Sequence, residues 1–285
     1  MSFDPIISGS LSFLVVLILM ALNVPIGISM LIVGFTGFAL ITGFEQALFV
    51  LGTAPFEAVS KYTLSVLPLF VLMGNLANRA NLSRNLYDAA YAVVGHYKGG
   101  LAMSTVGACA GFGMICGSSI ATAATMSQMA GPEMKRHGYS DALISGSVAS
   151  GGTLGIIIPP SVILIIYAYL TEQSIQQLFF AALIPGLIAV VLYMIAIRVY
   201  LLIYPDQGGH GEKMTTKDRI SALTKVFPIF LIFAVIMGGL YLGFFTATES
   251  AAVGVILVIL FIFLRGELTI ELLKNSIWDT IKTCL

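Results

Sequence analysis

Long uncharged, apolar stretches dominate this chain. Charged residues are absent from positions 5–44, 62–78, 99–132, 142–171, 173–197, 226–248 and 250–264. Because a bilayer core about 30 Å thick takes roughly 20 helical residues, such runs predict membrane-spanning helices. The first run is long enough for two helices, and Pro25 favours a helix start at its midpoint. The pattern predicts single spans at about 7–22, 25–43, 62–78, 173–200, 226–243 and 247–264.

The run at 99–132 is better explained by a re-entrant hairpin than by a crossing. As one helix it would be about 51 Å long, too long for one span and too short for two spans with a turn. Lys98 precedes it, and Lys135 and Arg136 follow it, so both ends are expected on the cytoplasmic side. We predict two half-helices with a tip near Cys116–Ser119, shielded from lipid by protein or water.

The stretch 141–171 is also too long for one regular span, and helix breakers interrupt it. Gly151, Gly152 and Gly155 are followed by Pro159 and Pro160. Prolines cannot continue a helix without losing backbone hydrogen bonds. The pattern predicts one broken span, made of two half-helices around an unwound stretch.

The distribution of basic residues gives an orientation. With the N-terminus outside and the hairpin not crossing, 13 of the 14 Lys and Arg residues face the cytoplasm, and only Lys61 lies outside. A single crossing at 99–132 would instead move Lys135 and Arg136 to the outside. The basic residues therefore support the hairpin independently of its length.

Composition agrees with a polytopic membrane protein. Hydrophobic residues make up 58% of the 285 positions and charged residues 10%, well below the usual share of charge in soluble domains. The formal net charge of zero provides no electrostatic footprint for nucleic acid. Cys109, Cys116 and Cys284 fit neither a disulfide framework nor a paired metal motif.

Two amphipathic segments suggest an internal repeat. Residues 43–63 and 266–285 each follow a pair of spans joined by a short turn, and are expected on opposite sides of the membrane. Opposite orientation is typical of the inverted repeats of secondary transporters. We predict a first repeat at 1–225, ending in a cytoplasmic loop at 205–225. The start of a second repeat, at 226–285, would then leave an inverted-repeat ion-transporter fold with its second repeat incomplete.

Two local elements complete the predicted all-α fold of about seven spans and one hairpin. The polar, amphipathic stretch 79–97 is predicted to be an interfacial helix at the cytoplasmic surface. Thr248 is predicted to cap the helix that follows it, with Glu249 favoured by the helix dipole.

The two interruptions are the candidate site, because transporters bind ions where helices are discontinuous. Hydroxyl and backbone oxygens are concentrated there, and neither of the runs 99–132 and 142–171 contains Asp or Glu. Neutral oxygen ligands suit a releasable monovalent cation better than calcium or zinc. The candidate residues are Gly117, Ser118, Ser119, Thr122, Gly151, Gly152, Thr153, Gly155 and the residue before Pro159.

Three motifs resemble a known family. They are Gly117–Ala123 (GSSIATA), Gly151–Ser161 (GGTLGIIIPPS) and Gly239–Glu249 (GLYLGFFTATE). The chain resembles the N-terminal two-thirds or so of the large permease subunit of tripartite ATP-independent periplasmic (TRAP) transporters. The resemblance implies a sodium-coupled importer of small organic acids, not an enzyme, in the bacterial inner membrane with a periplasmic N-terminus. It also implies an elevator-type motion, a small membrane subunit, a periplasmic substrate-binding protein, and no cofactor apart from the coupling ion.

The resemblance also assigns roles to residues. The sodium site would comprise Ser118, Ser119, Gly152, Thr153, Gly155 and Pro159. The hairpin tip and substrate pathway would comprise Gly117, Thr122, Gly151, Pro160 and Ser161. Members of the family carry a second hairpin and a second broken helix. The chain is therefore expected to be a fragment, a truncated reading frame or a part complemented by another polypeptide, and not to transport alone.

Two alternatives remain open at this point. Ser118 and Ser119 in a re-entrant loop could serve an intramembrane serine hydrolase, although no histidine is expected at that depth to act as base. A membrane scaffold subunit without transport activity is the other.

Overall fold

A computed structural model describes residues 5–211 and 213–284. These residues form thirteen α-helices, the short 3₁₀ helices η1 (Tyr62–Ser65) and η2 (Pro205–Gln207), and no strand beyond an isolated bridge between Lys98 and His210. The all-α polytopic fold is therefore confirmed. The α-helices are α1 (Pro5–Ala21), α2 (Ile26–Thr42), α3 (Phe44–Ser60), α4 (Val66–Arg79), α5 (Leu82–Val94), α6 (Gly100–Cys116), α7 (Ser119–Arg136), α8 (Asp141–Ile157), α9 (Val162–Leu170), α10 (Ile175–Ile203), α11 (Thr216–Tyr241), α12 (Ala247–Leu264) and α13 (Ile270–Cys284).

Among the residues that the structure describes, three helices, α10, α11 and α12, are long and apolar enough to cross a membrane. The pair α8 and α9 adds a fourth candidate if the two are taken as one span bent by 46°. The helices α1, α2 and α6 are apolar but shorter. The predicted number of seven spans thus stays a prediction.

Contacts divide the chain into two compact units, one ending at Lys61 and the other beginning at Tyr62. In the first unit, α2 packs against both α1 and α3. A turn at Asn23 (φ +63°) precedes Pro25 and the start of α2, which confirms the predicted division of the first apolar run. Large side chains such as Phe13 and Leu40 are exposed, as expected for helices whose outer surface meets lipid or another protein.

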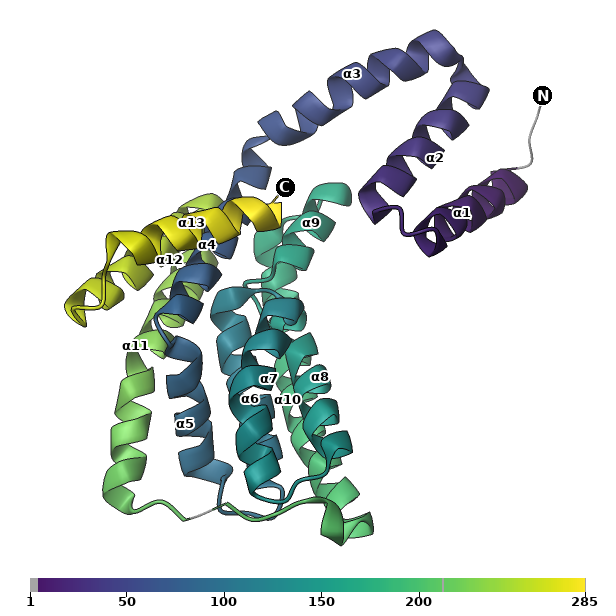
Figure 1. The fold of residues 1–285 in the computed structure, drawn as a ribbon. Coiled ribbons are helices and arrows are strands. Elements are labelled where there is room, and N and C mark those ends of the chain that lie inside the picture. Colours follow the sequence, from purple (N-terminus) through teal and green to yellow (C-terminus); the bar gives the residue numbers. More distant parts are fainter. Residues whose placement is uncertain (1–4, 212, 285) are drawn as a thin grey trace. The chain divides into compact units, whose positions relative to one another are not determined.

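In the second unit, the stretch 99–132 forms the predicted helical hairpin, and its re-entrant position in a membrane stays a prediction. Helices α6 and α7 lie side by side, reverse direction at Gly117 and Ser118, and pack against α8 (Figure 1). All but two of the residues of α6 are buried, so this glycine- and alanine-rich helix is enclosed by protein. Small side chains permit such close helix packing.

The break in the following span lies later than predicted. Helix α8 runs without interruption through Gly151, Gly152 and Gly155, and the chain leaves the helix only at Ile158–Ser161. The prediction that the glycine stretch is unwound is therefore wrong. Glycine lowers helix propensity but keeps every backbone hydrogen bond, whereas proline removes a donor.

The stretch 79–97 is packed into the bundle. Its helix α5 buries Leu82, Leu86 and Tyr87 and contacts α6 and α11 (Figure 1). The amphipathic pattern correctly predicted an apolar face on this helix. That face packs against other helices, whereas the sequence predicted that it would lie on the membrane surface.

Thr246, and not Thr248, caps α12. The Thr246 hydroxyl accepts a hydrogen bond from the Glu249 N–H (3.3 Å), and the Glu249 carboxylate accepts one from the Thr246 N–H (2.8 Å). Thr246 and Glu249 have the three-residue spacing of a capping box. This spacing favours Thr246 over the predicted Thr248 as the capping residue.

The loop between α10 and α11 is hydrogen-bonded to both ends of the hairpin segment, on the side opposite the tip. The Tyr139 hydroxyl, between α7 and α8, donates to the carbonyl of Gly209 (3.0 Å) and accepts from the N–H of Leu101 (3.2 Å). The N–H of Gly99 also donates to the Gly209 carbonyl (3.3 Å). Burial raises the pKa of Tyr139 to about 12, so the hydroxyl keeps its proton at neutral pH.

We expect Tyr139→Phe to lower the free energy of unfolding by about 1–2 kcal/mol, because it removes one donor and leaves the Leu101 N–H without its acceptor. Denaturant titration of the purified chain in detergent measures the change. Tyr97→Phe is the matched control, since Tyr97 is 51% exposed. Equal stability of the two variants would contradict the role given to Tyr139.

Candidate functional site

The hairpin tip and the break between α8 and α9 are in direct backbone contact. The Val162 N–H donates to the Gly117 carbonyl (3.3 Å). Gly117 has φ +61°, the left-handed region that favours glycine. A Cβ atom on Gly117 would lie 2.7 Å from the carbonyl oxygen of Pro160. The contact therefore requires a residue without a side chain at the tip.

A glycine face of α8 receives the first turn of α7. A Cβ atom on Gly155 would lie 2.8 Å from Thr122 Oγ1 and 2.9 Å from the Ser118 carbonyl oxygen, and one on Gly152 would lie 2.7 Å from Ala123 Cβ. The hairpin tip and the second interruption therefore meet at Ser118 and Gly155. The helices approach closely because these positions carry no side chain.

Four helix ends meet at this contact. The Ser118 hydroxyl caps α7 by accepting from the Ala121 N–H (3.4 Å), and the Ser161 hydroxyl caps α9 by accepting from the Leu164 N–H (3.4 Å). Helices α6 and α8 end beside them. Free carbonyls and the negative dipole ends of α6 and α8 favour a cation, whereas the N–H groups of α7 and α9 favour an anion.

The prolines leave two carbonyls of α8 without helical donors. In a continuous helix, the carbonyls of Gly155 and Ile156 would accept from residues 159 and 160, but Pro159 and Pro160 have no N–H. Nearby, the Thr122 hydroxyl is fully buried and donates to the Ser118 carbonyl (2.7 Å). The oxygen atom of that hydroxyl can also accept, and the Cys116 thiol lies within hydrogen-bonding reach of it.

A cavity of about 170 Å³ opens at the tip. It takes Gly117, Ser118 and Ser119 from the hairpin and Asn75 from α4. Asn75 Nδ2 donates to Thr280 Oγ1 in α13 (3.0 Å), and Arg79 forms an ion pair with Asp279 of the same helix. Helix α13 is thus attached to α4 beside the cavity. The full lining is Val71, Asn75, Cys116, Gly117, Ser118, Ser119, Ile120, Ala121, Ile156, Val162, Ile163 and Thr283.

Thr153 points away from this cluster. Its side chain is exposed on α8, donates to the Ser150 carbonyl (2.6 Å) and lies 3.2 Å from the Tyr193 hydroxyl of α10. Of the other predicted residues, Pro159 is buried in the break, and Gly151 packs beside Cys109 Sγ one turn away. The residues that gather at the tip and the break are Gly117, Ser118, Ser119, Thr122, Gly152, Gly155, Pro160 and Ser161. Helical periodicity explains the outlier, because positions 152 and 155 lie on one face of α8 and position 153 lies on another.

The chemistry of the cluster is that of neutral oxygen atoms and helix ends. Its two capping serines are occupied by backbone N–H groups, and no histidine is among the residues that line the cavity. A serine nucleophile requires a base within hydrogen-bonding reach. The described lining offers a place for a cation or a small anion, but no such base.

Comparison with known proteins agrees with this geometry. The sequence model of a transporter family, described as the DctM component of tripartite ATP-independent periplasmic transporters, matches residues 13–285. The chain belongs to this family.

Several curated relatives are permease proteins of TRAP transporters. A C4-dicarboxylate permease protein of Pseudomonas aeruginosa is 38% identical over 70% of this chain and 47% of its own length. An ectoine permease protein of Halomonas elongata is 32% identical over 70% of this chain and 47% of its own. A sialic acid permease protein of Haemophilus influenzae is 30% identical over 93% of this chain and 43% of its own. The chain thus spans about half the length of the curated relatives it matches.

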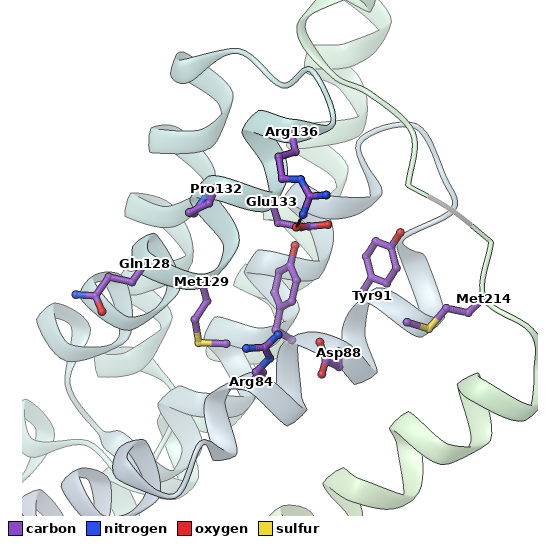
Figure 2. A pocket seen from close by; sticks show the side chains of 10 residues that line it. Arg84, Asp88, Tyr91, Gln128, Met129, Pro132, Glu133, Arg136 and Met214 are labelled. Atoms are coloured by element: carbon purple, nitrogen blue, oxygen red, sulfur yellow. Dashed lines mark hydrogen bonds and ion pairs between the residues drawn. The ribbon is translucent and has the colours of Figure 1, made fainter.

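The TRAP permease chain has a second, charged pocket that the sequence analysis did not identify. It measures about 480 Å³ and lies between α5 and the C-terminal half of α7. Figure 2 shows Arg84 and Asp88 projecting from α5, with Glu133 and Arg136 above them on α7. Arg136 donates to Glu133 (3.5 Å). Arg84 and Arg136 contribute to the predicted orientation, but no local sequence pattern indicates that α5 and α7 face one another.

Proposed function

We propose that this chain acts in the large membrane subunit of a sodium-coupled importer of small organic acids in the bacterial inner membrane. A small membrane subunit and a periplasmic substrate-binding protein would be its partners, and its N-terminus would face the periplasm. Family membership supports the proposal, as do the substrates after which the relatives are named, which are C4-dicarboxylates, ectoine and sialic acid. Substrate and partners are proposed for the assembled transporter.

The meeting of four helix ends at the hairpin tip carries the proposal. The C-terminal ends of α6 and α8, including the unpaired carbonyls of Gly155 and Ile156, would bind sodium together with the Thr122 hydroxyl. The N-terminal ends of α7 and α9 would attract the carboxylate of the substrate. An ion and an anion bound at adjacent ends would stabilise each other, which is the physical basis proposed for coupling.

Motion and symmetry complete the proposal. Residues 1–225 would form the first repeat and residues 226–285 the start of an inverted one, as in other secondary transporters. The interlocked unit of α6, α7, α8 and α9 would move as one body in an elevator-type cycle, because its backbones touch directly.

Uptake measured in proteoliposomes tests the coupling. The transporter, reconstituted with its small subunit and binding protein, should accumulate organic acid when an inward sodium gradient is imposed. An equal potassium gradient should leave accumulation at the background level. Uptake that proceeds equally well with either cation would contradict sodium coupling.

Thr122→Val should raise the sodium concentration for half-maximal uptake about tenfold or more. Valine removes an oxygen atom that the bound cation would contact, and contacts with charged groups contribute about 1.5–3 kcal/mol. Thr122→Ser retains the oxygen atom and is the matched control, expected within about threefold of the parent protein.

Thr153→Val tests whether a predicted site residue that lies away from the hairpin tip affects sodium binding. Because Thr153 faces α10, the substitution should leave the sodium dependence close to that of the parent. A large sodium effect at Thr153 and none at Thr122 would place the ion elsewhere.

A further inference from the structure

We propose that Lys225 and Arg265, together with Asn85, bind the phosphate of an anionic phospholipid from the cytoplasmic leaflet. These three residues line a pocket of about 370 Å³ with Pro228 and Phe261. The pocket is lined by residues of α5, of α11 and of the C-terminal end of α12, and α11 packs against both α5 and α12. It is separate from the hairpin tip and independent of the proposed sodium site.

The two basic residues lie at one depth. Lys225 immediately precedes the uncharged run 226–248, and Arg265 immediately follows the run 250–264. Counted along α11 and α12 from the turn that joins them, the two positions lie about 24 and 27 Å away at 1.5 Å per residue. This separation matches the thickness of a hydrocarbon core, so the pocket lies at headgroup level.

Charge favours an anion in this pocket. Within the described residues, Lys225 makes neither an ion pair within 4 Å nor a side-chain hydrogen bond, although its charge also acts on the Asp88 carboxylate of α5. Arg265 lies 5.5 Å from the centre of the Phe261 ring and pairs with Glu267 (2.9 Å). That pair is about 40% exposed, and the five N–H donors of arginine leave others free for phosphate. The C-terminal end of the α12 dipole repels an anion, but it is equivalent to only about half a negative elementary charge.

The surroundings identify a lipid as the occupant. Large apolar side chains next to both basic residues are more than half exposed, as expected of a surface that contacts acyl chains. They are Phe227, Phe230 and Leu231 after Lys225, and Phe263 and Leu264 before Arg265. Basic groups beside a span, with a pocket between helices on the cytoplasmic side, are the arrangement that recognises anionic headgroups.

Native mass spectrometry of the purified chain in neutral detergent tests this proposal. Phosphatidylglycerol should bind several-fold more tightly than phosphatidylcholine. Lys225→Gln and Arg265→Gln should each weaken phosphatidylglycerol binding about fivefold, the effect of one basic group near an anionic surface. Lys274→Gln on α13, an exposed lysine outside the pocket, is the matched control and should change nothing.

Glu267→Gln gives a readout of opposite sign. It releases Arg265 from its carboxylate partner and should strengthen phosphatidylglycerol binding, a gain that misfolding cannot produce. Lys225→Arg should retain binding. Equal affinity for the two lipids, or displacement of phosphatidylglycerol by inorganic phosphate at millimolar concentration, would overturn the proposal, the latter by indicating a site for soluble phosphate.

Discussion

Gly155→Ala should destabilise the protein and reduce sodium-driven uptake more than tenfold. The new methyl group would lie 2.8 Å from Thr122 Oγ1 and 2.9 Å from the Ser118 carbonyl oxygen, closer than carbon and oxygen atoms tolerate. Overpacking of this kind costs about 1–3 kcal/mol, and the gain in helix propensity of about 1 kcal/mol offsets only part of it. Denaturant titration in detergent and uptake in proteoliposomes measure the two effects.

Gly146→Ala on the same helix is the matched control. A Cβ atom at Gly146 would meet nothing within 4 Å, so the helix-propensity gain should appear alone and stability should rise by up to about 1 kcal/mol. Thr122→Ala in the Gly155→Ala background should restore part of the stability, because one of the two close contacts is removed. If the two glycine variants changed stability in the same direction by the same amount, the close packing of α7 on α8 would be disproved.

The sequence predicted the helical elements and the hairpin because these depend on long, one-dimensional patterns. Charge-free runs marked α10, α11 and α12, and the basic residues at both ends of 99–132 required a reversal that the structure places at Gly117 and Ser118. The break between α8 and α9 lies at the prolines, which lack a backbone N–H, and not at the glycines that precede them. Such features need no knowledge of tertiary contacts.

Features that depend on three-dimensional direction could not be predicted in the same way. Thr153 has the residue type expected of an ion ligand, yet its position on α8 directs it to Tyr193. The amphipathic helix α5 displays an apolar face, but no local pattern tells whether lipid or α6 and α11 will cover it. The charged pocket of Figure 2 arises only when α5 and α7 are brought together.

Gly117→Ala should be the most damaging single change at the hairpin tip. Alanine at φ +61° costs about 1 kcal/mol through backbone strain alone. In addition, its Cβ atom would lie 2.7 Å from the Pro160 carbonyl oxygen, and a backbone atom cannot move aside as a flexible side chain can. The tip must then separate from the break and lose the hydrogen bond from Val162 to Gly117. We expect a total loss of about 2–4 kcal/mol and no sodium-driven uptake.

Gly138→Ala isolates the strain from the contact. Gly138 also has a left-handed backbone, with φ +75°, but nothing lies within 4 Å of its Cβ position. The control should therefore lose only the strain contribution of about 1 kcal/mol and retain transport. The difference between the two variants measures the interlock of tip and break, since the conformational cost is common to both. If Gly117→Ala were no more destabilising than Gly138→Ala, the two interruptions would not depend on each other, and the four helix ends would not form one site.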